Sequence, residues 1–295
     1  MKNRLHIALS VLLLLVAILV FGVYISKHSY LLNRLKNISP FIVFWLLLLY
    51  SLWFISLSLI IKYCLRICNV SISTGENILL NAYSTMANFF IPGQGGPAVR
   101  GAYLYKKHKL KIRLYIFVTL IYYLIYGIIN LFLAFSTSSL WWILIPLSIV
   151  ALAVGIFGGR KYISKFKINK NELSLSSTNL NYLLAATIFQ ILIIIAINLV
   201  ELHSVNSGIS IKQVAIYTGV ANLSIFVALT PGAIGIREGF LIFSQKLHHI
   251  SVTNIISASI IDRSIFLVVL AILLIYILTT HAKTRLFTSK TNPET

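Results

Sequence analysis

Four charged residues form two adjacent pairs inside hydrophobic stretches of this sequence. Arg237 and Glu238 follow a proline-glycine turn, and Asp262 and Arg263 interrupt the last apolar run. A charge inside such a stretch costs free energy unless it has a partner or faces a polar cavity. Pairing of Glu238 with Arg263, or of Asp262 with Arg237, would meet this requirement. The charges therefore predict either a buried structural ion pair or a site for a substrate or a proton.

Two proline-glycine stretches accompany these charges, IPGQGG at 91–96 and TPGAIG at 230–235. Glycine and proline allow a sharp reversal of the backbone. A helix that restarts after the reversal points N–H groups and its positive end toward an anion, and arginine binds phosphate in a forked geometry. We expect the two stretches to meet and to form a cavity for a lipid phosphate. The predicted site residues are Pro92, Gly93, Gly95, Gly96, Arg100, Pro231, Gly232, Gly235, Arg237, Glu238, Asp262 and Arg263.

The elements that carry these residues follow from composition. Hydrophobic residues make up 58 % of the chain and charged residues 11 %, which excludes a soluble globular domain. A helix needs about 20 apolar residues to cross a bilayer. The runs that approach or exceed this length are 7–25, 40–61, 114–157 (two spans), 180–200, 213–236 and 264–280, the last extended backward by 254–261. We expect an all-α integral membrane domain over residues 1–285 and a short cytoplasmic tail at 286–295.

The positive charge sets the expected topology. The net charge is +19, but the Lys and Arg residues lie beside hydrophobic runs, which favours topology signals over a nucleic-acid surface. With six full spans and both termini in the cytoplasm, 18 of the 25 Lys and Arg residues lie inside and five outside, and Arg237 and Arg263 lie within hydrophobic sequence. This count requires segments 77–105 and 213–247 to be re-entrant helical hairpins, although the first part of the latter is long enough to span by itself.

An internal repeat supports the paired hairpins. Pro92 and Pro231 are 139 residues apart, and the same offset superimposes most of the expected spans. The repeats would cover about 5–136 and 139–280. Each contains three spans, an odd number, so the second repeat enters the membrane from the opposite side. Inverted repeats with broken helices at matching positions are typical of alternating-access transporters.

The remaining residues that could carry chemistry have simpler explanations. Cys64 and Cys68 are expected to be reduced, inert thiols, because two cysteines form no disulfide framework or metal cluster. Glu76 and Glu201 lie near span ends and are expected at the membrane interface. His248 and His249 are expected in an exposed outer loop. We predict no metal and no cofactor.

The motifs resemble those of a known family. The stretches IPGQGGPAVRGAYL at 91–104 and LTPGAIGIREGFLIF at 229–243, with Arg263 in SIIDRSIFLVVL, are similar to the transmembrane, flippase-like domain of lysylphosphatidylglycerol synthases, the membrane part of the multiple peptide resistance factor. The resemblance covers nearly the whole chain and implies a membrane domain that handles lipids. One departure is TLIYYLIYGI at 119–128, where family members often carry a Glu-Arg pair in this span.

The expected function is movement of an anionic phospholipid or a lipid-linked phosphate across the cytoplasmic membrane. The alternative is a membrane subunit or module of a lipid-modifying transferase, acting with a separately encoded enzyme. The lysyl-transferring members of the family carry a large soluble catalytic domain, whereas this sequence ends about 15 residues after its last expected span. The sequence shows no nucleotide-binding loop and no nucleophile–base motif, so it favours a non-enzymatic protein whose partners are anionic membrane lipids rather than nucleic acid.

Overall fold

The computed structural model describes residues 38–91, 95–136, 173–227, 230–233 and 235–290, and for 281–290 it describes the backbone alone. The described residues form helices and no strand, which confirms the all-α fold class for this part of the chain. Four helices are long and apolar enough to cross a membrane: α3 (Pro40–Ile67), α6 (Ile112–Ala134), α8 (Ser177–Val205) and α12 (Val252–Lys290, apolar through Thr280). The spans expected at 7–25 and 140–157 lie outside the described residues. The total of six spans and the inverted repeat therefore stay predictions.

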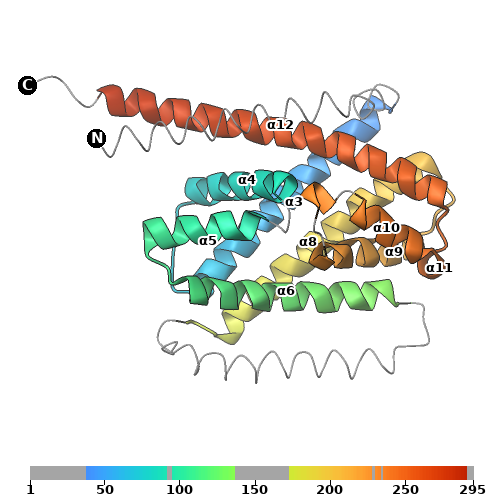
Figure 1. The fold of residues 1–295 in the computed structure, drawn as a ribbon, viewed down its shortest axis with the longest axis horizontal. Coiled ribbons are helices and arrows are strands. Elements are labelled where there is room, and N and C mark those ends of the chain that lie inside the picture. The colour runs from blue at the N-terminus through green and yellow to red at the C-terminus, as the bar shows by residue number, and fades with distance from the viewer. Residues whose placement is uncertain (1–37, 92–94, 137–172, 228–229, 234, 291–295) are drawn as a thin grey trace, which may run out of the picture.

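The packing of α3 against α8 forms the centre of the described structure. These two helices lie side by side and cross the molecule obliquely, with α6 on one side of them and α12 on the other (Figure 1). The apolar side chains of α3 and α12 form one core with the inner face of α4, which includes Leu46, Met86 and Leu270. The long helices thus build a frame that holds the shorter helices at fixed places.

The first proline-glycine stretch joins two helices that pack against each other, α4 (Thr74–Phe90) and α5 (Gly95–His108). The start of α5 lies against the end of α4, because a methyl group added at Gly96 would stand 2.5 Å from Asn88 Oδ1 and 2.6 Å from the Ser84 carbonyl oxygen. Only a glycine leaves room for this contact. The pair of antiparallel neighbours is the local structure that a hairpin requires.

A cluster of polar side chains ties the open end of this pair together. Glu76 at the start of α4 accepts hydrogen bonds from Tyr103 at 2.6 Å and lies 2.6 Å from His108 Nε2 and 3.0 Å from Lys107 Nζ. Partial burial opposes ionisation of Glu76, but the hydrogen bonds from His108, Tyr103 and Lys107 outweigh it and lower its pKa to about 2.

The second stretch is broken into several short helices. The helix α9 (Ile211–Leu223) is followed by the 3₁₀ turns η2 (Ser224–Val227) and η3 (Pro231–Ala233), then by α10 (Ile236–Phe243) and α11 (Gln245–His248). The apolar run that begins at Gln213 was long enough to span, yet α9 has 13 residues. Gly232, Ala233 and Gly235 have φ values of 59°, 54° and 82°, which explains the two glycines and separates α10 from the helices before it.

The two broken segments lie at opposite ends of α6 and α12. Figure 1 shows α4 and α5 toward one end and α9, α10 and α11 toward the other. The second turn meets the end of α4 between these ends, because η3 packs against α4 and a methyl group added at Gly232 would lie 3.1 Å from the Phe89 ring. This arrangement brings together segments that are 139 residues apart in the sequence.

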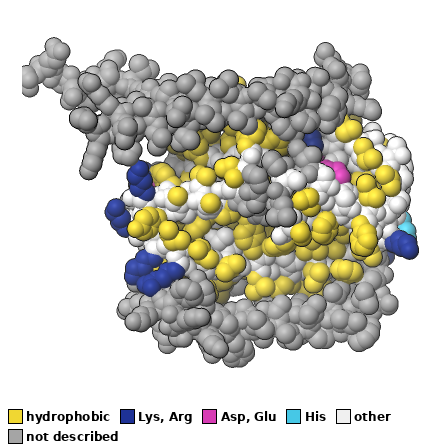
Figure 2. All heavy atoms as spheres, in the orientation of Figure 1, with side chains coloured by type: hydrophobic (Ala, Val, Ile, Leu, Met, Phe, Trp, Pro, Cys, Tyr) yellow, Lys and Arg dark blue, Asp and Glu magenta, His cyan; other side chains and the backbone are white. Residues whose placement is uncertain are grey.

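Basic side chains gather at one end of the molecule. Figure 2 shows Lys and Arg side chains at the edge where α5 ends and α6 begins, next to a largely hydrophobic face. Lys106, Lys107, Lys109 and Lys111 are exposed there. This is the basic loop that the topology prediction assigns to the cytoplasm.

The histidine pair differs from the prediction. His248 is completely buried, with Nε2 2.9 Å from the Leu241 carbonyl oxygen and Nδ1 accepting the Ile250 N–H at 3.1 Å. The expectation of an exposed outer loop was therefore wrong for His248, because its ring closes the turn between α10 and α12. Cys64 and Cys68 are free thiols and are buried.

Close approach of α9 to α6 at Gly219 gives a test of the packing. A Cβ at this position would stand 2.5 Å from the Ala134 backbone nitrogen and 2.7 Å from the Asn130 carbonyl oxygen. We expect Gly219→Ala to lower the free energy of unfolding by about 1–3 kcal/mol, because the added methyl group overlaps with α6. The loss outweighs the higher helix propensity of alanine and is measured as a lower melting temperature in detergent. Gly75→Ala is the matched control, since a Cβ at Gly75 meets nothing within 4 Å. Equal melting temperatures for Gly219→Ala and the native protein would contradict the close contact.

The Glu76 cluster predicts a pH-dependent contribution to stability. Because the folded-state pKa is about 2, below the usual 4.5, the ionised Glu76 stabilises the fold at neutral pH. This contribution falls as the pH drops from about 4.5 to about 2. We expect Glu76→Gln to lower the melting temperature at neutral pH and to approach the native protein in acid. A difference that is constant down to about pH 2 would show that the carboxylate charge is not responsible.

Candidate functional site

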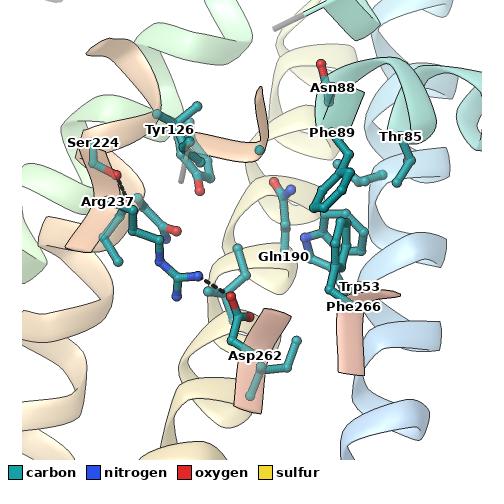
Figure 3. A pocket seen from close by; sticks show the side chains of 18 of the residues that line it. Trp53, Thr85, Asn88, Phe89, Tyr126, Gln190, Ser224, Arg237, Asp262 and Phe266 are labelled. Atoms are coloured by element: carbon teal, nitrogen blue, oxygen red, sulfur yellow. Dashed lines mark hydrogen bonds and ion pairs between the residues drawn. The ribbon is translucent and has the colours of Figure 1, made fainter. Parts of the chain in front are cut away.

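A cavity of about 270 Å³ lies between the two broken segments. Side chains from α3, α4, α5, α6, α8, α9, α10 and α12 line it, together with both 3₁₀ turns. Figure 3 shows Trp53, Phe89 and Phe266 on one side of this space and Arg237 and Asp262 on another. The cavity thus has an aromatic wall and a charged wall.

The structure brings part of the predicted site together at this cavity. The predicted residues that line it are Arg100, Gly232, Arg237, Asp262 and Arg263. Glu238 stands behind the wall and contacts Arg263. Pro231 begins η3, and Gly235 ends the turn before α10. Gly95 and Gly96 are buried against α4 and do not line the cavity. Pro92 and Gly93 lie outside the described residues.

Arg237 and Asp262 form an ion pair in the cavity wall. Arg237 Nη1 lies 2.5 Å from Asp262 Oδ2, and Arg237 Nη2 lies 3.3 Å from Asn198 Oδ1. The Tyr50 hydroxyl donates to the other oxygen of Asp262. The carboxylate on α12 is therefore held by donors from α10 and α3, and Arg237 has acceptors on α12 and α8.

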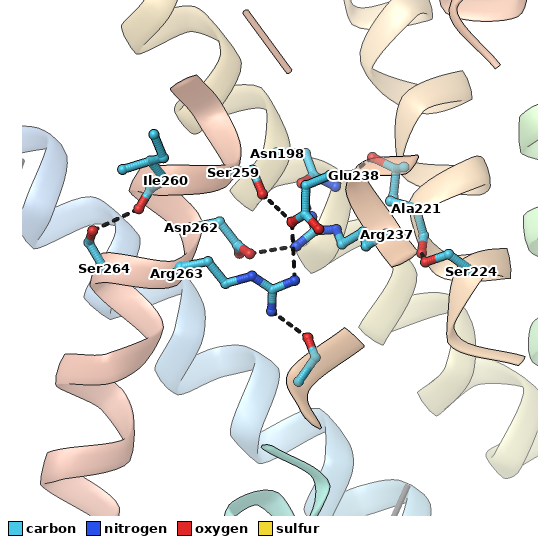
Figure 4. A network of polar contacts seen from close by, with 12 residues as sticks. Asn198, Ala221, Ser224, Arg237, Glu238, Ser259, Ile260, Asp262, Arg263 and Ser264 are labelled. Atoms are coloured by element: carbon cyan, nitrogen blue, oxygen red, sulfur yellow. Dashed lines mark hydrogen bonds and ion pairs between the residues drawn. The ribbon is translucent and has the colours of Figure 1, made fainter. Parts of the chain in front are cut away.

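Glu238 and Arg263 form a second ion pair beside the first. Arg263 Nη2 lies 3.3 Å from Glu238 Oε1, and the Ser259 hydroxyl donates to the same oxygen (Figure 4). Arg263 Nη1 donates to the Gly232 carbonyl oxygen at 2.7 Å. Both pairings that the sequence allowed are present. Arg263 also fixes the turn whose backbone has positive φ values, which gives it a structural role.

Backbone N–H groups were expected to receive an anion at the two turns. The Gly96 N–H instead donates to Asn88 Oδ1 at 2.7 Å, and the Gly235 N–H donates to Glu238 Oε2 at 2.8 Å. Side chains of the protein already satisfy these two groups, as capping side chains do at helix starts. The arginine side chains are therefore the better candidates for anion binding.

Arg100 differs from the other two arginines of the cavity. It lies on α5, lines the cavity and is partly buried. Its Nε is buried without a hydrogen-bond partner, and no ion pair of Arg100 occurs among the described residues. It interacts electrostatically with Tyr115, Tyr122 and Tyr123 of α6. Arg100 is thus a cation without a carboxylate partner in the described part of the chain.

Polar residues of the long helices complete the cavity and were not singled out in the sequence. Tyr122 and Tyr126 stand one turn apart on α6, and the Tyr122 hydroxyl donates to Gln190 Oε1 at 3.0 Å. Gln190 and Asn198 lie eight residues apart on α8, a spacing that places both on one helix face. Polar side chains at helical spacing inside an apolar run were the signal that could have found them.

Glu201 lies in the protein interior, with an exposed fraction of 2 %. The helix α8 continues to Val205, five residues beyond the predicted end at position 200, so Glu201 is surrounded by neighbouring helices. Its expected position near the membrane interface stays a prediction. Glu76 lies at the start of α4, as described above. Among the described residues, no group of three or more His, Cys, Asp or Glu side chains is arranged to hold a metal ion.

Comparison with known proteins adds one finding. The sequence model of a family described as lysylphosphatidylglycerol synthase TM region matches residues 5–274. Among curated proteins, none matches the chain.

The Arg237–Asp262 pair predicts a specific pattern of stability. Removing one partner leaves a buried charge, so we expect Arg237→Gln and Asp262→Asn each to destabilise the protein by about 3–5 kcal/mol. The double variant should lose less than the sum of the two single losses, because neither charge is then left unpaired. Thermal unfolding in detergent measures all three. Strictly additive losses would show that the two side chains do not stabilise each other.

Proposed function

The chain belongs to the lysylphosphatidylglycerol synthase transmembrane region family, and we propose that it moves an anionic phospholipid or a lipid-linked phosphate across the cytoplasmic membrane. The observation that carries this proposal is the unpaired Arg100 in a cavity between two broken helical segments. A partly buried guanidinium without a carboxylate partner favours a ligand that brings a negative charge. Membrane lipids supply such a charge on their phosphate.

The size of the cavity supports a headgroup rather than a whole lipid. Its volume of about 270 Å³ lies just below the usual range of about 300–1,000 Å³ for small-molecule pockets. In this proposal, the phosphate and its polar substituent enter the cavity, and the acyl chains remain in the bilayer. Phe89 and Phe266 would then contact the apolar part of the ligand next to the glycerol.

The two broken segments support a transport mechanism. Inverted repeats with paired hairpins place a substrate site near the middle of the membrane, where each half can open toward one side. The broken segments lie toward opposite ends of α6 and α12, and η3 of the second segment contacts α4 of the first, which fits this arrangement. We assign 77–105 and 213–247 to re-entrant hairpins and both termini to the cytoplasm, in agreement with the basic end of the molecule.

The name of the family favours a second candidate function. It associates this type of membrane region with synthesis of lysylphosphatidylglycerol, so the chain could serve as the membrane module of a lipid-modifying transferase. In that case the cavity would present a lipid headgroup to a separately encoded enzyme. The two functions differ in one measurable property, since only the first moves lipid across a bilayer without another protein.

Reconstitution into liposomes tests the proposal. We expect the purified protein to move a fluorescent phosphatidylglycerol between leaflets, and Arg100→Ala to reduce the initial rate at least tenfold, because the variant lacks the cation for the phosphate. Lys106→Ala is the matched control, since Lys106 is an exposed basic residue on the same helix and should retain the native rate. Native protein that moves no lipid, or an Arg100→Ala variant as fast as Lys106→Ala, would overturn the transport function.

A further inference from the structure

The charges of the cavity do not balance within its ion pairs. Arg237 pairs with Asp262, and Arg263 pairs with Glu238. Arg100 supplies a third positive charge to the same cavity. One further carboxyl group, that of Glu201, lies beside this cluster in the protein interior. The ionisation of Glu201 therefore decides whether this set of residues is neutral or carries one positive charge.

The environment of Glu201 indicates a bound proton. Its Oε1 is buried without a hydrogen-bond partner, and it has no ion pair among the described residues. Asn198, three residues before Glu201 on the same helix, lies 3.3 Å from Arg237 Nη2, which places Glu201 about one helical turn from the Arg237–Asp262 pair. A buried carboxylate without a cation or hydrogen-bond donor is costly, so the neutral form of Glu201 is favoured. Asp262 accepts from Arg237 and Tyr50, so Asp262 is the ionised group and Glu201 the neutral one.

Titratable and charged side chains from several helices surround Glu201. The titratable and charged groups that interact with Glu201 are Tyr50 on α3, Tyr217 on α9, Arg237 on α10, and Asp262 and Arg263 on α12. On α6, Tyr126 interacts with Arg237 and lines the cavity. Both arginines in this set have other carboxylate partners, so Glu201 has no cation of its own.

We propose that Glu201 is a proton-binding site of the cavity, and that its proton binds together with a phosphate monoanion held by Arg100. The inference rests on the proposed function, because it takes the ligand to be an anionic headgroup. A solvent proton bonds to a Glu201 carboxyl oxygen, and the carboxyl group is then neutral. The residue set carries one positive charge in this state, which the anion compensates.

The physical basis is charge balance at low dielectric. When Glu201 is ionised, its charge compensates that of Arg100, and an arriving anion would give the cluster a net negative charge. Electrostatic interactions are strong inside a protein, so the anion binds better to the protonated form. By linkage, the anion must favour protonation by the same factor. Lipid movement through this cavity would then carry a proton with each anion.

Calorimetric titration with a short-chain lipid tests the coupling. The probe is dihexanoyl phosphatidylglycerol, whose phosphodiester keeps one negative charge across the pH range. We expect its Kd for the native protein in detergent to increase with pH, approaching tenfold per pH unit once Glu201 is ionised in the free protein. Glu201→Gln should bind at every pH with the affinity that the native protein shows in acid. Glu76→Gln, which removes a carboxylate outside the cavity, should keep the native pH dependence.

Two further measurements separate the possible outcomes. Titrations in buffers of different ionisation enthalpy give the number of protons taken up per lipid, which should be near one for the native protein at high pH and zero for Glu201→Gln. Glycerophosphoglycerol, the same headgroup without acyl chains, should show the same pH dependence if the phosphodiester is the group recognised.

The outcomes separate the anion site from the proton site. If the native protein does not bind the lipid, or Arg100→Ala binds it equally well, the anion site itself is wrong. If binding requires Arg100 but does not depend on pH, or if Glu201→Gln retains the dependence, the proton site alone is overturned.

Discussion

The ion pair between Arg237 and Asp262 is the contact on which the centre of this structure depends. Its two side chains come from α10 and α12, and their remaining hydrogen bonds reach Tyr50 on α3 and Asn198 on α8. Asn198 in turn donates to Thr218 on α9. Because an unpaired charge in a hydrophobic interior is costly, these five helices have one low-energy arrangement around the pair. The position of the second broken segment follows from this constraint.

The second requirement is that a helix can be interrupted inside a hydrophobic protein. A break exposes N–H and C=O groups, and each needs a partner where water is scarce. The structure provides such partners from side chains: Asn88 for Gly96, Glu238 for Gly235, and Arg263 for Gly232. The glycines allow the chain to turn and the neighbouring helices to approach. The charged residues near the second motif are therefore part of the fold as well as part of the cavity wall.

The sequence predicted the four long apolar helices that the structure describes and allowed either ion pair as an alternative, because a run of about 20 apolar residues and an intramembrane charge each have few physical solutions. It also placed the breaks near the proline-glycine motifs, but it did not give the ends of the helices. The helix that begins near Gln213 stops at Leu223, because tertiary contacts outweigh the helix propensity of the residues that follow. The burial of Glu201 was not predicted, because a position near a span end does not say how far the helix continues. The roles of Tyr50 and Gln190 depend on contacts between distant helices, which no local pattern encodes.

The three arginines of the cavity divide into two kinds. Arg237 and Arg263 have carboxylate partners, so substitution of either arginine should mainly lower the stability of the fold. Arg100 has none among the described residues, so its positive charge must be balanced by something outside these ion pairs. The sequence left open whether the charged residues form a structural ion pair or a ligand site. In the proposed function these alternatives apply to different residues: the pairs build the wall of the cavity, and the unpaired Arg100 is the group that would bind an anion. A single Arg100 would be sufficient for this role when Glu201 is neutral, because the charges of the two ion pairs then balance each other and the positive charge of Arg100 remains.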